Sequence, residues 1–297
     1  MTKETEKTKE HNAIIAKELN IKVWQVEATA SLLDEGATVP FISRYRKEAT
    51  GTLDEVAVSA IRDRLEQLRE LDKRREAIIS SLEERSLLTD ELKERIAAAE
   101  TMTALEDIYL PFRPKRRTRA TVAREKGLEP LAQRIFSQEE FDLAAEAAAF
   151  VDAEKGVESA EDALAGARDI IAEWVSEDQA SRERMRELFV SKGLMKSKVI
   201  TGKEAEGIKY KDYYEWEEPA SQAPSHRILA IRRGETEGFL SYRITPPDEE
   251  ALALLEGLFV KGPGPVPEQV RLAVHDGYKR LLSSAMEVEL RLSLKKK

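Results

Sequence analysis

The chain has 297 residues, with 48 Lys and Arg against 56 Asp and Glu, and therefore a formal net charge of −8. This length is sufficient for two domains, because single hydrophobic cores stop growing at roughly 250–300 residues. A hydrophobic content of 41% excludes wholesale disorder. No apolar run approaches the roughly 18–20 residues of a membrane-spanning helix, and the charged N-terminus lacks the apolar segment of a secretory signal. We therefore expect a cytoplasmic protein without a membrane partner.

The sequence offers little for a metal or cofactor site. It contains no cysteine, which excludes a disulfide framework and a thiolate zinc site. The histidines at His11, His226 and His275 are too widely spaced for a local zinc motif. We find no phosphate-binding loop, dinucleotide fingerprint, nucleophile elbow or HExxH motif. The sequence therefore predicts a non-catalytic protein that needs no metal or cofactor.

The net charge is unevenly distributed along the chain. Residues 1–136 carry 25 basic and 25 acidic side chains, residues 137–190 carry 5 and 15, and residues 191–297 carry 18 and 16. Within the neutral first segment, Tyr109 to Lys126 concentrates seven basic residues against the single Glu125. Such asymmetry within one chain indicates a local surface that faces a polyanion.

The first half of the chain is predicted to be helical. Residues 1–10 alternate Lys, Glu and Thr without an apolar period, so we expect a disordered tail there. Helical periodicity begins at Asn12, and residues 54–84 form the longest periodic segment. Together these patterns predict an N-terminal helical region over residues 11–136, which contains a basic loop at residues 111–124.

The second half combines an acidic module with a mixed segment. Residues 137–190 are predicted to form an acidic helical module of three helices. Residues 191–297 are predicted to form a short β-hairpin near residues 195–244 and C-terminal helices, which we expect to pack back on the N-terminal helices. The predicted fold class is mainly α, a multi-helix bundle with helix-turn-helix-like helices and one small β-hairpin.

The helix-turn-helix-like pair lies at Thr89–Glu100 and Ala104–Leu110. A DNA-reading helix carries polar side chains that contact bases. The second helix of this pair instead carries Glu106 and Asp107, and Pro111 ends it. Sequence-specific reading of the major groove is therefore not expected.

The basic stretch within residues 113–124 is the strongest candidate for a binding site. Guanidinium groups offer planar, two-pronged donors that match phosphate oxygens. The candidate cations of this stretch are Arg113, Lys115, Arg116, Arg117, Arg119 and Arg124. An alternative stays open at this point, in which these side chains dock onto the acidic residues 137–190 of the same chain.

A smaller basic cluster supplies second-rank candidates at Arg44, Arg46 and Lys47. Tyr45 lies between the two arginines and could stack on a base. We favour ordinary packing for this tyrosine, because a tyrosine between two arginines is more often simply packed against its neighbours.

Several blocks of the sequence resemble the Tex family of bacterial transcription accessory proteins. The two most specific are LLDEGATVPFISRYRKE at residues 32–48 and LEDIYLPFRPKRRTRA at residues 105–120. Further similar blocks lie at Thr50–Glu55, Gly127–Ala132, Ser225–Gly234 and Tyr278–Leu282. Members of this family continue into a ribonuclease-H-like domain, helix-hairpin-helix repeats and an OB-fold RNA-binding domain. The resemblance therefore implies that the chain corresponds to the N-terminal part of such a protein and ends before the ribonuclease-H-like domain.

Two functional hypotheses follow. The resemblance implies a mainly helical protein that binds nucleic acid, chiefly RNA, and the arginines of residues 113–124 would supply contacts that are independent of base sequence. The alternative is a protein-interaction scaffold that contacts the transcription machinery through the acidic helices of residues 137–190.

Overall fold

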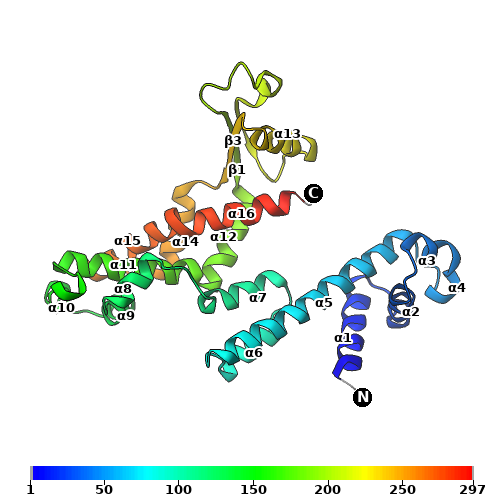
Figure 1. Cartoon of the computed structure of the whole chain (residues 1–297), viewed down its shortest axis with the longest axis horizontal. Coiled ribbons are helices and arrows are strands. Elements are labelled where there is room, and N and C mark those ends of the chain that lie inside the picture. Colours follow the sequence, from blue (N-terminus) through cyan, green and yellow to red (C-terminus); the bar gives the residue numbers. More distant parts are fainter. Residues whose placement is uncertain (1–2, 296–297) are drawn as a thin grey trace. The chain divides into compact units, whose positions relative to one another are not determined.

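A computed structural model describes residues 3–295 of the chain. The chain forms two compact units, Met1–Phe112 and Arg113–Lys297 (Figure 1). Sixteen α-helices and one three-stranded sheet lie within the described residues, so the prediction of a mainly α fold is confirmed. The boundary between the units differs from our expectation. It falls after Phe112, inside the basic loop predicted at residues 111–124, so residues 113–124 belong to the second unit rather than to an N-terminal region that ends at residue 136.

The N-terminal unit is organised along the 30-residue helix α5, with α1 to α4 on one part of it and α6 and α7 on the other (Figure 1). Its helices are α1 (Lys3–Glu18), α2 (Val23–Asp34), α3 (Val39–Tyr45), α4 (Lys47–Thr50), α5 (Glu55–Glu84), α6 (Asp90–Ala98) and α7 (Met102–Tyr109). A first apolar cluster joins α5 to the preceding helices through buried residues such as Val58 and Ile61. A second cluster joins its C-terminal half to α6 and α7. One amphipathic helix therefore supports both ends of the unit.

The expected disordered tail is wrong over residues 3–10, because α1 begins at Lys3. Contacts with α5 hold this helix. The Lys7 ammonium donates to Glu76 Oε1 at 2.7 Å, and His11 Nε2 lies 3.0 Å from Asp72 Oδ2. The partners are more than 60 residues away in sequence, so local periodicity could not reveal them. The first two residues lie outside the described part of the chain.

The second unit is built around helix α11, which is buried on most of its length. Its helices are α8 (Arg119–Glu125), α9 (Glu129–Ser137), α10 (Leu143–Ala149), α11 (Ala160–Glu177), α12 (Gln179–Lys192), α13 (Ser225–Thr236), α14 (Asp248–Phe259), α15 (Pro265–Gly277) and α16 (Ser283–Leu294). Ile170 and Ile171 of α11 are fully buried in a core that extends from α8 to α16. Residues 137–190 are therefore not a separate acidic module, because α11 lies at the centre of the unit.

A small antiparallel sheet completes the second unit, and its strand order is β2-β1-β3. The strands are β1 (Leu194–Val199), β2 (Glu215–Pro219) and β3 (Leu240–Thr245). β1 and β3 pair at the two ends of the segment in which a β-hairpin was predicted, near residues 195–244, whereas β2 was not predicted. Trp216 alternates with charged residues in β2, and one face of this strand is half-buried. Strands are normally predicted from alternating apolar residues, and the three carboxylates of this segment leave no such pattern.

Two features that would suggest other functions are absent between residues 3 and 295. None of the helices there has the length and the apolar character that crossing a bilayer demands. In the same part of the chain, we find no group of three or more His, Asp or Glu side chains placed to hold a metal ion. The expectation that the C-terminal helices pack on the N-terminal ones stays a prediction.

Candidate nucleic-acid interface

The basic loop connects the end of the N-terminal unit to helix α8. We define it as residues 113–118, which form no regular secondary structure. Pro114 restricts the backbone of the residue before it to extended conformations, which disfavours a continuing helix. Helix α8 begins only after Thr118, whose Oγ1 accepts a hydrogen bond from the Thr121 amide at 3.0 Å. The loop therefore ends at a capped helix that fixes its last residue.

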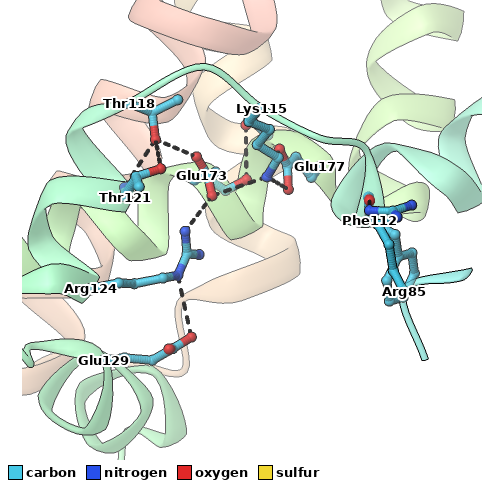
Figure 2. Close-up of polar contacts among 10 residues, drawn as sticks. Arg85, Phe112, Lys115, Thr118, Thr121, Arg124, Glu129, Glu173 and Glu177 are labelled. Carbon is cyan, nitrogen blue, oxygen red and sulfur yellow. Dashed lines mark hydrogen bonds and ion pairs between the residues drawn. The ribbon is translucent and has the colours of Figure 1, made fainter. Parts of the chain in front are cut away.

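The carboxylate of Glu173 on α11 binds both the loop and α8 (Figure 2). Its Oε1 accepts hydrogen bonds from the Lys115 ammonium at 3.1 Å and from Arg124 Nη1 at 2.8 Å. Its Oε2 accepts one from the Thr118 hydroxyl at 3.1 Å. The Glu173 side chain is only 7% exposed. One nearly buried carboxylate is thus shared by three donors from two segments of chain, and we call this group the Glu173 cluster.

Glu177, one helical turn further along α11, gives Lys115 a second carboxylate partner at 2.6 Å. Burial would raise the pKa of Glu173, but the Arg124 hydrogen bond and the nearby Lys115 charge outweigh it and hold this pKa below its ordinary value. Burial dominates at Glu177 and raises the pKa of that carboxyl, although Lys115 opposes the change. The Glu173 cluster therefore stabilises one ionised carboxylate more strongly than its neighbour.

These contacts decide between the two readings of the basic stretch for two of its members. Lys115 and Arg124 dock onto the acidic helix of the same chain, as the alternative hypothesis expected. Their side chains are 25% and 30% exposed, and each has a second carboxylate partner. Both charges are thus matched by carboxylates of the same unit, and these ion pairs connect residues 113–118 and α8 to α11.

The other cations of the stretch are exposed. Arg117 pairs with Glu125 at 2.9 Å, but the two side chains are 70% and 53% exposed. Such surface pairs contribute about 0–1 kcal/mol, so a phosphate can displace Glu125 readily. Arg113 and Arg116 are also exposed, and within residues 3–295 Arg116 has no hydrogen-bonded or ion-paired partner. The loop therefore presents guanidinium groups to solvent.

Arg119 lies at an open cleft of roughly 420 Å³, which is lined by Arg117, Thr118, Arg119, Val122 and Asp169. Asp169 is a partly buried carboxyl, and burial raises its pKa even though the charges of Arg280 and Arg119 oppose this change. The cleft has one acidic and two basic side chains. The cleft is therefore mainly basic, but the Asp169 carboxyl in its lining means that it is not a uniformly positive anion pocket.

The second-rank candidates lie in the N-terminal unit. Arg44, Arg46 and Lys47 are all exposed at the junction of α3 and α4. The Tyr45 side chain between them is 65% exposed, and its ring packs against Phe41, with 5.6 Å between the ring centroids. The structure separates the predicted cations into two groups, which belong to different units.

The Glu173 cluster was not predicted from the sequence, and neither was the exposure of the Trp24 and Phe41 rings. The spacing of Glu173 and Glu177 places both on one face of a helix, which was a usable signal. It was obscured because residues 137–190 contain 15 acidic side chains, and their sequence does not indicate which of them are buried. Arg85 was likewise missed. It donates to the Phe112 carbonyl at 2.5 Å and holds the last residue of the N-terminal unit (Figure 2).

Comparisons with known proteins give a consistent picture. The chain matches the model of the Tex-like protein N-terminal domain over residues 9–83 and that of the Tex central region-like family over residues 138–296. It is 48% identical over 232 residues to "Protein tex" of Bordetella pertussis, which covers 78% of this chain and 29% of that protein. It is 42% identical over 237 residues to "Transcriptional accessory protein Tex" of Neisseria gonorrhoeae, covering 80% and 31%.

A more distant similarity extends to eukaryotes. The human "S1 RNA-binding domain-containing protein 1" is 24% identical over 243 residues, which is 79% of this chain and 24% of that protein. The chain thus spans less than a third of the length of each of these three relatives. Since the central-region family alone covers more than half of the 297 residues, the chain belongs to the Tex family of transcription accessory proteins.

Proposed function

We propose that this region of a Tex-family protein is non-catalytic and contributes sequence-independent binding of nucleic acid, chiefly RNA, in the cytoplasm. The observation that carries the proposal is that the basic residues of the stretch fall into two groups, one paired within the chain and one exposed. Lys115 and Arg124 form ion pairs with Glu173, whereas Arg116, Arg117 and Arg119 are exposed. A loop that is fixed from within and displays guanidinium groups outward is suited to contact phosphates.

The proposed contacts are to phosphate oxygens rather than to bases. Arginine matches phosphate with two parallel hydrogen bonds, and such contacts position a nucleic acid without reading its sequence. The names of the more distant relatives, which refer to an S1 RNA-binding domain, add weight to RNA. The scaffold hypothesis has less support, because Glu173 and Glu177 bond within the chain.

The test compares two triple variants of the full chain in binding single-stranded RNA. In the first, Arg116, Arg117 and Arg119 are each replaced by Glu. The control introduces the same change in charge elsewhere in the second unit, at the exposed Lys198, Lys211 and Arg243. We expect the first variant to bind at least about tenfold more weakly than the control at moderate salt, because electrostatic contacts dominate such binding. Equal affinity of the two variants would place the binding surface elsewhere.

A further inference from the structure

The N-terminal unit has a surface that combines exposed aromatic rings with unpaired positive charges. We define this aromatic–basic surface by Trp24 at the start of α2, Phe41 and Tyr45 on α3, and the basic residues Arg44, Arg46 and Lys47. The three aromatic side chains are 47%, 40% and 65% exposed in that order. Large aromatic side chains are normally buried on most of their area, so three exposed rings on α2 and α3, which both contact α4, require an explanation.

The rings are held in place rather than loosely attached. Phe41 and Tyr45 are four residues apart on one helical face, and their ring centroids are 5.6 Å apart. The guanidinium carbon of Arg46 lies 5.3 Å from the Phe41 centroid, within the range of a cation–π contact. The two rings are tilted by 43° to each other and held in defined positions, so a planar base could stack on the exposed Tyr45 ring with little loss of side-chain entropy.

Trp24 is fixed by the backbone of α4. Gly51 ends this helix with φ +66°, and a Cβ there would lie 2.6 Å from Cη2 of Trp24. Glycine is thus required both for the left-handed backbone and for the close approach of the indole. The neighbouring Gln25 amide donates to the carbonyls of Thr50 and Gly51 at 3.1 and 3.2 Å, which ties the start of α2 to the end of α4.

The charges of this surface differ from those of the rest of the unit. Several other arginines of the unit are paired with carboxylates, as in Arg64 with Glu18 and Arg69 with Asp34. Between residues 3 and 295, no carboxylate forms an ion pair with the three basic side chains of the aromatic–basic surface. From residue 36 to residue 53, Glu48 is the single acidic residue. The surface is therefore complementary to an anion.

From these observations we infer that the aromatic–basic surface binds single-stranded nucleic acid by stacking unpaired bases on Tyr45, Phe41 and Trp24, with Arg44, Arg46 and Lys47 contacting the phosphates. Stacking accepts any base, because every base has a π-face, and it requires strands in which the bases are not already paired. α4 is a single turn, about 6 Å long. Tyr45 lies before its first residue, and Gly51, which contacts Trp24, follows its last residue. The inference rests on the proposed function, that the chain binds nucleic acid, and adds a second site that selects unpaired strands.

The test uses the full chain and two probes of equal length and equal phosphate number, oligothymidine and an abasic strand. Tyr45→Leu removes an exposed ring and is not expected to disturb folding. It should weaken oligothymidine binding by at least about fivefold, the low end of the effect of one stacked base, and leave abasic binding unchanged. Tyr45→Phe keeps the ring and should bind like the parent. Oligothymidine, but not the abasic strand, should quench a tryptophan signal that Trp24→Leu removes.

The outcomes separate this inference from the proposed function. If the parent binds both strands equally and Tyr45→Leu changes neither affinity, stacking is refuted, while weakening of both by the triple Glu variant of Arg116, Arg117 and Arg119 would still support the proposed function. If the parent binds neither strand nor single-stranded RNA, both are refuted. A charge control, Lys17→Glu on α1, should change binding less than Arg44→Glu does; an equal effect would contradict a defined surface.

Discussion

Replacing Glu173 by Gln removes the charge of the Glu173 cluster while keeping the shape of the side chain. In the variant Lys115 retains Glu177 at 2.6 Å, and Arg124 retains only Glu129 at 3.4 Å. A hydrogen bond to a charged group contributes about 1.5–3 kcal/mol, and breaking a buried ion pair costs about 3–5 kcal/mol. Because both cations are partly exposed and keep a second partner, water recovers part of this loss. We expect the second unit to lose about 2 kcal/mol of stability.

Two measurements follow the effect. The unfolding temperature of the second unit should fall by roughly 4–8 °C, given a domain of this size. Amide hydrogen exchange, measured by mass spectrometry, should accelerate in residues 113–125, because local opening then requires less free energy. The matched control is Glu161→Gln on the same helix. Its carboxylate pairs with Arg168 but is 68% exposed, so the expected loss is below about 0.5 kcal/mol.

The reasoning would be refuted by a Glu173→Gln variant that unfolds at the parent temperature and shows parent-like exchange in residues 113–125. In that case the Glu173 cluster does not position the basic loop. A loss of stability without faster exchange in this segment would also contradict a local role, because it would show that the carboxylate supports the core rather than the loop.

Other predictions concern pH and helix packing. The folded-state pKa of Glu173 is lowered, so the stabilisation by its carboxylate is complete above the unfolded-state pKa of about 4.3 and is lost as the pH falls through the folded-state value. In urea denaturation, the difference in the free energy of unfolding between the parent and Glu173→Gln should therefore decrease in acid. The pKa of Glu177 is raised, which reverses the sign, so the parent should gain stability relative to Glu177→Gln on acidification, and an opposite trend would disprove the assignment. A Cβ at Gly277 would lie 2.9 Å from the Ala172 carbonyl oxygen, so Gly277→Ala should cost about 1–3 kcal/mol in the same assay. Nothing lies within 4 Å of a Cβ at Gly257, and Gly257→Ala within α14 should stabilise by up to about 1 kcal/mol; equal effects of the two alanines would refute the packing argument.

Much of the helical structure could be predicted because it depends on local pattern. The long periodic segment at residues 54–84 corresponds to α5, and the Asp54 carboxylate accepts from the Ala57 amide at 2.8 Å as an N-terminal cap. Thr89 likewise caps α6. Apolar spacing and capping side chains act over a few residues, so one sequence was sufficient to locate these elements.

The remaining features depend on contacts between distant residues. The charge distribution along the sequence offered residues 137–190 as a docking partner for the basic stretch, but only the fold identifies Glu173 and Glu177 as the partners of Lys115. The burial of a carboxylate beside the loop determines which one pairs with Lys115, and the sequence does not distinguish among the 15 acidic side chains of that segment. The exposure of Tyr45 could not be predicted for the same reason, because its surroundings come from the packing of α2, α3 and α4.

The central claim, that exposed arginines beside the Glu173 cluster contact phosphates, is tested most directly by the salt dependence of RNA affinity. The measurement compares the parent with a variant in which Arg116, Arg117 and Arg119 are replaced by Gln. Each neutralised phosphate on a single strand contributes about −0.7 to the slope of log affinity against log salt concentration. The account predicts that this slope becomes shallower by about 2 in the variant. An unchanged slope would contradict it.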